Sequence, residues 1–126
     1  MIRAVRIPDC GNSPRKRFVQ ELAIALPRLQ TALVARRVSD AVRWRILGQA
    51  ELAGCSAVIQ PLRRRRAPDL AQIVVRHGAA QGTTGCVSGT VEFRRRLPVH
   101  SHDVHKFTSA KGNCVRSITS FVVQGR

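Results

Sequence analysis

The spacing of apolar residues changes once along this chain, from a helical period to a strand period, and this change constrains the fold most. Phe18, Leu22 and Leu26 recur every four residues, which predicts the buried face of an amphipathic helix. From residue 70 onward apolar and polar residues alternate, as in strands that bury one face. Helices followed by a run of strands predict an α+β fold in which helices pack on a long antiparallel sheet.

Turn-forming and helix-breaking residues give approximate bounds for the helices. A Ser-Pro pair at 13–14 predicts a helix start, because serine caps the first turn and proline lacks only an N–H that is unpaired there anyway. Pro27 should end this helix, and a second short helix is expected over 29–37. Gly54 should open a third helix that ends at the arginine run 63–66.

The alternating segments predict five strands. They lie at 42–46, 73–77, 87–93, 99–107 and 114–123. Residues 1–12 have no helical period and are expected to form an extended arm. With 126 residues and 44% hydrophobic content the chain can form one core, so 1–126 is expected to be a single domain.

The chain gives no sign of export or of a membrane span. No run approaches the ~18 apolar residues that a spanning helix needs, and the start MIRAVRIPDCGN lacks a sustained apolar stretch and a small-residue cleavage site. The four cysteines at 10, 55, 86 and 114 have no CxxC spacing, which excludes a zinc knuckle or a thioredoxin-like motif. We therefore expect a cytoplasmic protein with reduced cysteines, the alternative being two disulfides in a secreted domain.

The charge is strongly positive, with 22 Lys and Arg against 7 Asp and Glu, and 19 of the 22 are arginine. Arginine clusters at 36–37, 63–66 and 94–96 could neutralise phosphates of a nucleic acid, or they could reflect a GC-rich coding sequence. Single-strand binders also need exposed aromatic residues, and the aromatic residues here lie on the apolar sides of their elements. Nucleic acid is therefore kept as a partner that the pattern allows but does not favour.

Several strings resemble a known family. They are CGNSPRKRFVQELAIAL at 10–26, VSDAVRWRILG at 38–48, Gly54 at the start of a helix, and SAKGNCVRSITSFVV at 109–123. With the order of elements, they resemble the nuclear transport factor 2-like superfamily, in particular its SnoaL-like (polyketide cyclase-like) bacterial proteins of the ketosteroid isomerase-like group. The resemblance spans most of the chain and includes no catalytic signature.

The resemblance implies a cone-shaped fold, in which three helices from the N-terminal half close one side of a strongly curved antiparallel sheet. The cavity between them would hold an apolar ligand or a reacting substrate. It also implies a homodimer that pairs through the outer face of the sheet. Other relatives have lost catalysis and only bind or scaffold, so an interaction module is a further possibility.

The chain departs from the ketosteroid isomerases of this superfamily. Those enzymes use an oxyanion tyrosine and an aspartate base in the first long strand, whereas this chain has no tyrosine and reads Arg43, Trp44, Arg45 in that strand. That particular isomerase chemistry is therefore not expected here.

Charged residues in the strands predict which side chains face the cavity. An arginine or lysine in a strand normally points to solvent, so its neighbours point inward. Arg43 and Arg45 would thus direct Trp44 inward, and Arg76 would direct His77 inward. The same argument, applied around Lys106 and Arg116, gives the other inward residues: Asp103, His105, Phe107, Thr119 and Phe121.

His77 and Asp103 are the candidate catalytic residues, because a carboxylate can orient an imidazole and raise its basicity, and histidine titrates near neutrality. The alternative is that each is a polar group with its hydrogen bonds satisfied on a sheet face. The predicted ligand-binding residues are Trp44, His77, Asp103, Phe107 and Phe121.

The string HSHDVHKF at 100–107 is a candidate metal site, since His100 and His102 share one face of a strand. Asp103 and His105 fall on the opposite face, so only two ligands converge, and we expect no metal. No phosphate-cradling glycine loop and no GxSxG elbow is present either, and we expect no cofactor.

The sequence thus predicts a small-molecule-binding domain with an apolar cone cavity. If it is an enzyme, a cofactor-free isomerase, cyclase or hydrolase fits these residues best. The alternative is a non-enzymatic basic protein that binds nucleic acid or another polyanion through its arginine clusters.

Overall fold

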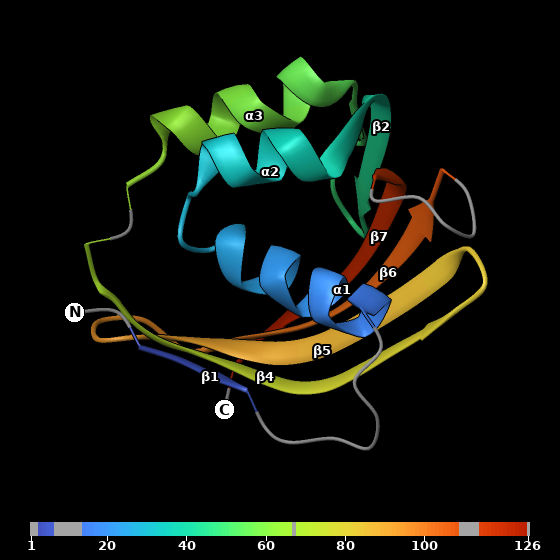
Figure 1. Cartoon of the computed structure of the whole chain (residues 1–126). Coiled ribbons are helices and arrows are strands. Elements are labelled where there is room, and N and C mark those ends of the chain that lie inside the picture. The colour runs from blue at the N-terminus through green and yellow to red at the C-terminus, as the bar shows by residue number, and fades with distance from the viewer. Residues whose placement is uncertain (1–2, 7–13, 67, 109–113, 126) are drawn as a thin grey trace.

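The fold was determined as a computed structural model, which describes residues 3–6, 14–66, 68–108 and 114–125 of the 126. Within these ranges three helices pack on one curved sheet (Figure 1). The helices are α1 (Pro14–Ala25), α2 (Thr31–Arg37) and α3 (Cys55–Arg64). None of these described helices is long and apolar enough to cross a membrane.

The sheet of the described chain has seven strands in the order β1-β4-β5-β6-β7-β2-β3. Their bounds are β1 (Arg3–Arg6), β2 (Val38–Ile46), β3 (Leu52–Ala53), β4 (Leu70–Gln81), β5 (Thr84–Phe93), β6 (Val99–Phe107) and β7 (Val115–Gln124). All pairs are antiparallel except β1 with β4 and β2 with β7, which are parallel. The predicted α+β class, with three helices on a curved and mostly antiparallel sheet, is confirmed.

The predicted bounds agree well with the observed ones for the helices. α1 begins at Pro14 and ends at Ala25, just before Pro27. β2 begins at Val38, earlier than predicted, because residues 39–40 continue the strand that was expected to start beyond them. Part of the predicted arm forms β1, and its residues 7–12 lie outside the part of the chain that the structure describes.

The core lies between the helices and the concave face of the sheet. The sheet bends around α1, with α2 and α3 on the far side of that helix (Figure 1). A Cβ atom at Gly85 would lie 2.9 Å from Cγ1 of Val19, so a glycine there lets α1 approach β5 closely. The core includes the fully buried side chains Val19, Leu22, Val34, Val58, Val75, Val87, Phe107 and Ile118.

A β-bulge at Arg76 reverses the alternation of side chains along β4. Val75 lies opposite Gly89 and His77 lies opposite Ser88, so Arg76 is an extra residue without a partner on β5. The extra residue shifts the alternation by one, and His77 is exposed on the outer face. The prediction that Arg76 directs His77 inward is therefore wrong.

A second bulge, at Arg116, has the same effect on β7. The pairing with β6 leaves Arg116 as the extra residue. Ser120 consequently faces inward and is buried, whereas Phe121 faces outward and its side chain is 44% exposed. The prediction that Phe121, and Thr119 two positions before it, face inward is wrong for the same reason.

Candidate functional site

The inner face of β6 places three alternate residues in the core, as predicted. Asp103, His105 and Phe107 are all buried, while Lys106 between them donates a hydrogen bond from Nζ to Thr84 Oγ1 at 2.8 Å. A carboxyl group and an imidazole are thus held beneath the helices, on the central part of the sheet.

Asp103 belongs to a hydrogen-bonded chain that crosses three neighbouring strands. Ser120 on β7 donates from Oγ to Asp103 Oδ1 at 2.5 Å, and Trp44 on β2 donates from Nε1 to Ser120 Oγ at 2.9 Å. The single hydroxyl proton of Ser120 is used in the hydrogen bond to Asp103. The Ser120 oxygen can therefore accept the hydrogen bond from the indole N–H of Trp44. The second carboxylate oxygen has no hydrogen-bond partner among the described residues.

Sequence reasoning missed Ser120 because it assigned the wrong face to β7. The inward prediction for Trp44 was right: Trp44 packs partly against the core, between the exposed residues Arg43 and Arg45. A correct alternation on β7 would have placed Ser120 beside Asp103, since the two lie directly opposite in the strand pairing.

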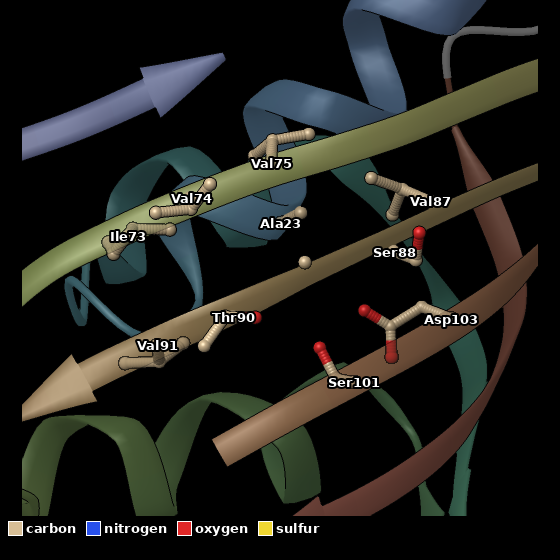
Figure 2. A pocket seen from close by; sticks show the side chains of 11 residues that line it. Ala23, Ile73, Val74, Val75, Val87, Ser88, Thr90, Val91, Ser101 and Asp103 are labelled. Atoms are coloured by element: carbon tan, nitrogen blue, oxygen red, sulfur yellow. The ribbon is translucent and has the colours of Figure 1, made fainter. Parts of the chain in front are cut away.

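A small cavity of about 20 Å³ adjoins Asp103. Its walls are mostly aliphatic, with the Asp103 carboxyl group and the Ser101 hydroxyl together on β6 (Figure 2). Its lining residues are Ala23, Ile73, Val74, Val75, Val87, Ser88, Gly89, Thr90, Val91, Ser101 and Asp103. The cavity is therefore an apolar space with an acidic group in its wall.

The surroundings of Asp103 favour its neutral form. Burial raises the pKa of Asp103 above its usual 3.8, and the hydrogen bond from Ser120 and the charge of nearby His102 oppose this effect only in part. A carboxyl group of this kind can donate a hydrogen bond or a proton to a bound molecule when neutral. It can accept a proton when ionised.

His105 is buried in a different way. Its side chain is fully enclosed, and neither ring nitrogen has a hydrogen-bond partner among the described residues. Burial lowers the pKa of His105 to about 4, and a contact with the backbone of Gly85, whose geometry is too poor for a hydrogen bond, opposes this lowering only in part. His105 is therefore a neutral imidazole in the core, and it does not line the cavity.

Phe107 is also part of the core rather than of the cavity wall. Its ring meets that of Phe18 edge to face, with the centroids 5.5 Å apart and an angle of 66° between the planes. Of the five predicted ligand-binding residues, the structure thus brings Trp44 and Asp103 together through Ser120, and it places Phe107 in the packed core.

The predicted pair of His77 and Asp103 does not form. His77 lies on the outer face of the sheet and Asp103 on the inner face, because of the bulge at Arg76. Phe121, on the outer face, contacts His102 with a ring distance of 6.3 Å.

The candidate metal ligands His100 and His102 also lie on the outer face, and both ring nitrogens of His100 are within hydrogen-bond distance of protein groups. His100 Nδ1 is 3.0 Å from Thr90 Oγ1, and its Nε2 is 2.7 Å from the carbonyl oxygen of Gly125. No group of three or more metal-ligating side chains occurs within the described ranges. Three of the four cysteines, Cys55, Cys86 and Cys114, are free thiols.

Solved structures of several proteins share this fold. An LEH-like epoxide hydrolase of M. tuberculosis matches with a TM-score of 0.70 at 13% identity, over 86% of this chain and 81% of that chain. An epoxide hydrolase/cyclase-like enzyme of pyran ring formation in the polyether salinomycin matches with a TM-score of 0.68 at 17% identity, over 86% and 90%. A nuclear transport factor 2-like protein of unknown function from Burkholderia xenovorans LB400 matches with a TM-score of 0.69 at 14% identity, over 87% and 83%.

No protein-family model and no curated protein matches the sequence. At these identities the similarity to solved structures concerns the fold. The chain therefore has the nuclear transport factor 2-like fold that the sequence resemblance predicted.

Proposed function

We propose that this domain binds a small, largely apolar molecule in the cavity beside Asp103. The observation that supports this function best is the buried carboxyl group in a mostly aliphatic cavity wall, with one oxygen bound by Ser120 and the other without a protein partner among the described residues. A buried polar group is normally fully hydrogen-bonded, so an open position on a carboxyl group favours a ligand there. Ligand pockets combine such a group with apolar walls.

The cavity must widen to admit a ligand. At about 20 Å³ it holds one group of the size of a water molecule. Val91 and Ser101 line it from partly exposed positions, so their side chains can move outward without breaking the core. A slim alkyl chain is therefore a better probe than a fused ring system.

Asp103 would act as a proton acceptor or donor in cofactor-free chemistry. Two proteins of the same fold are an LEH-like epoxide hydrolase and an epoxide hydrolase/cyclase-like enzyme, which supports hydrolysis or cyclisation as the class of reaction. Ser120 and Trp44 would hold the carboxyl group in place, and the surrounding aliphatic side chains would strengthen its interaction with a polarised ligand.

Binding of 1-octanol tests the cavity. Titration followed by NMR of the valine methyl groups should shift the signals of Val75, Val87 and Val91, which line it. Ala23→Leu, which fills the cavity from α1, should abolish these shifts, whereas Ala32→Leu on the exposed side of α2 should leave them unchanged. Equal shifts in both variants would show that octanol binds elsewhere.

Hydrolysis of 1,2-epoxyoctane tests Asp103 as a base. The carboxylate takes a proton from a water molecule as its oxygen bonds to a ring carbon and the C–O bond of the ring breaks; the released alkoxide takes a proton from solvent, which gives 1,2-octanediol. The rate should rise with pH through the raised pKa of Asp103 and should disappear in Asp103→Asn. His77→Gln should keep the full rate, because His77 lies on the outer face.

We also propose that two copies pair through the outer face of the sheet. Phe121 and Val123 are exposed there on β7, with 44% and 66% of their surfaces open, and large exposed apolar side chains on one strand favour an interface. Sedimentation should show a dimer for the intact protein and a monomer for Phe121→Ser. A monomer at all concentrations would exclude this pairing.

A further inference from the structure

Two arginine runs that are distant in the sequence both lie toward the end of the sheet where β4 begins and β5 ends. The first, Arg63–Arg66, follows the buried Leu62 at the end of α3, and the second, Arg94–Arg96, forms the turn after β5. Asp69, three residues after Arg66, is bound by the second run. Its carbonyl oxygen accepts from the Arg94 backbone N–H at 2.8 Å, and its carboxylate accepts from Arg96 Nε and Nη2 at 2.9 and 3.0 Å. We call these seven arginines the rim cluster.

The rim cluster lies at the end of the sheet where the cavity lies. The sheet residues that line the cavity are 73–75 of β4, 87–91 of β5, and 101 and 103 of β6. Arg94–Arg96 follows the end of β5, and Arg63–Arg66 precedes the start of β4. These two strand ends lie side by side (Figure 1). Val91 lines the cavity, and Phe93 follows it on the same face about 7 Å further along the strand. The guanidinium carbon of Arg96 lies 3.9 Å from the centroid of the Phe93 ring. A short path thus connects the cavity wall to the arginines.

Within the part of the chain that the structure describes, little of this positive charge is neutralised. Seven arginines stand against two carboxylates, those of Asp69 and Glu92. Arg96 is paired with Asp69, and Arg66 donates to the main-chain oxygens of residues 63 and 65. The helix dipole of α3 accounts for the two arginines in its last turn. Arg65, Arg94 and Arg95 are exposed and form no direct ion pair within the described ranges, although the charge of Arg95 acts on Asp69.

We propose that the ligand of the cavity is an amphipathic anion, whose apolar end enters the cavity and whose carboxylate or phosphate group is bound by the rim cluster. This inference rests on the proposed function of the cavity. The orientation of the ligand follows from the difference between the cavity and the rim cluster. The mostly aliphatic cavity wall with Asp103 disfavours an anion, whereas guanidinium groups form charge-assisted and often bidentate hydrogen bonds to an anion.

Three octyl compounds with the same chain and different head groups test the proposal. They are 1-octanol, octanoate and octyl phosphate, each titrated into the intact protein by calorimetry, with the valine methyl NMR signals as a check that all three enter the cavity. One or both anions should bind about tenfold or more tightly than octanol, and only their affinity should fall as salt is raised. The comparison of octanoate with octyl phosphate identifies the preferred head group.

A pair of charge-matched variants locates the head group. Arg94→Gln/Arg95→Gln should weaken binding of the preferred anion about three- to tenfold and leave octanol unaffected. The control Arg36→Gln/Arg45→Gln removes the same charge from exposed positions on α2 and β2. In the sheet β2 lies near the opposite edge from β4 and β5, so both affinities should stay unchanged. All these arginines are exposed, so an unchanged melting temperature is expected and serves as the control for folding.

The outcomes separate the inference from the proposed function. If octanol does not enter the cavity, the proposed function fails. If octanol enters and the anions bind no more tightly than octanol, the rim cluster is not the head-group site, although the proposed function of the cavity is retained. The same conclusion follows if both double variants weaken anion binding equally. Loss of duplex DNA binding in Arg94→Gln/Arg95→Gln, with octanoate and octyl phosphate unaffected, would assign the cluster to nucleic acid and overturn the inference.

Discussion

Asp103 and His105 lie two residues apart on the inner face of β6, and both are buried, yet their surroundings differ in a way that separates function from packing. Asp103 has the cavity on one side and the Ser120–Trp44 chain on the other. His105 has neither a cavity nor a hydrogen-bond partner among the described residues, and Phe107 follows it in the core. We call these the cavity half and the closed half of the inner face.

Burial favours the neutral form of both groups, so it raises the pKa of Asp103 and lowers the pKa of His105. A shifted pKa alone therefore does not distinguish a functional group from a buried polar one. The distinguishing features are access to a cavity and a hydrogen-bonded support, and only Asp103 has both.

The largest expected effect is on the packing of the closed half. Phe107→Ala should lower the free energy of unfolding by about 3–5 kcal/mol, because it removes a fully buried ring that packs on Phe18. Ser101→Ala in the cavity half should change it by less than about 1 kcal/mol. Urea unfolding measures both, and equal losses would remove the distinction between the halves.

The second expected effect is the pH dependence that His105 contributes. Its pKa is about 4 in the folded state, against 6.5 for an unperturbed histidine, so the unfolded chain binds a proton that the folded chain does not. Stability should therefore fall as pH decreases from 6.5 to about 4, by on the order of 3 kcal/mol. Above this pH range the contribution is constant.

His105→Leu isolates this contribution. The variant should lose that part of the pH dependence and should be at least as stable at neutral pH, because it removes two ring nitrogens that have no hydrogen-bond partner among the described residues. Urea unfolding over a pH series compares the two proteins. The same pH dependence in both would mean that the pKa of His105 does not differ between the folded and unfolded states, which would contradict the lowered value.

The third expected effect is opposite in sign and belongs to Asp103. Its raised pKa means that the folded state holds a proton more tightly than the unfolded state, so stability decreases as pH rises from 3.8 through the folded pKa. Asp103→Asn should abolish this decrease and gain about 0.5–2 kcal/mol at neutral pH, while losing the base function. Thermal unfolding at two pH values measures the gain. A less stable variant would indicate that the carboxylate is ionised and well paired.

The smallest expected effect concerns Ser120. Ser120→Ala should cost about 1 kcal/mol and should raise the pKa of Asp103 further, because the lost hydrogen bond favours the carboxylate. Trp44 is the single tryptophan, so a pH titration of its fluorescence should report the change. Ser117→Ala, on the outer face of β7, is the matched control and should leave the titration unchanged.

The sequence predicted the fold class, the three helices and the inward residues of β2 and β6, because their hydrophobic periods are regular. Two errors had one cause. At Arg76 and at Arg116 an arginine is the extra residue of a bulge, so an outward arginine no longer implies an inward neighbour. His77 and Phe121 were misplaced as a result, and Ser120 was missed.

The bulges depend on the pairing of distant strands, which a single strand's pattern does not contain. The same holds for the cavity and for the binding of Asp69 by Arg94 and Arg96. The sequence showed each arginine run, and only the tertiary fold shows that Arg94–Arg96 lies beside the start of β4.

The pKa of Asp103 is the most direct test of the proposed site. A titration followed by NMR of its carboxyl carbon, without and with 1-octanol, measures the ionisation of this group and its coupling to the cavity. We predict a pKa above 3.8 that rises further with octanol, because the alkyl chain excludes water from the carboxyl group. A pKa at or below 3.8 that does not respond to octanol would contradict the assignment of Asp103 to a ligand site.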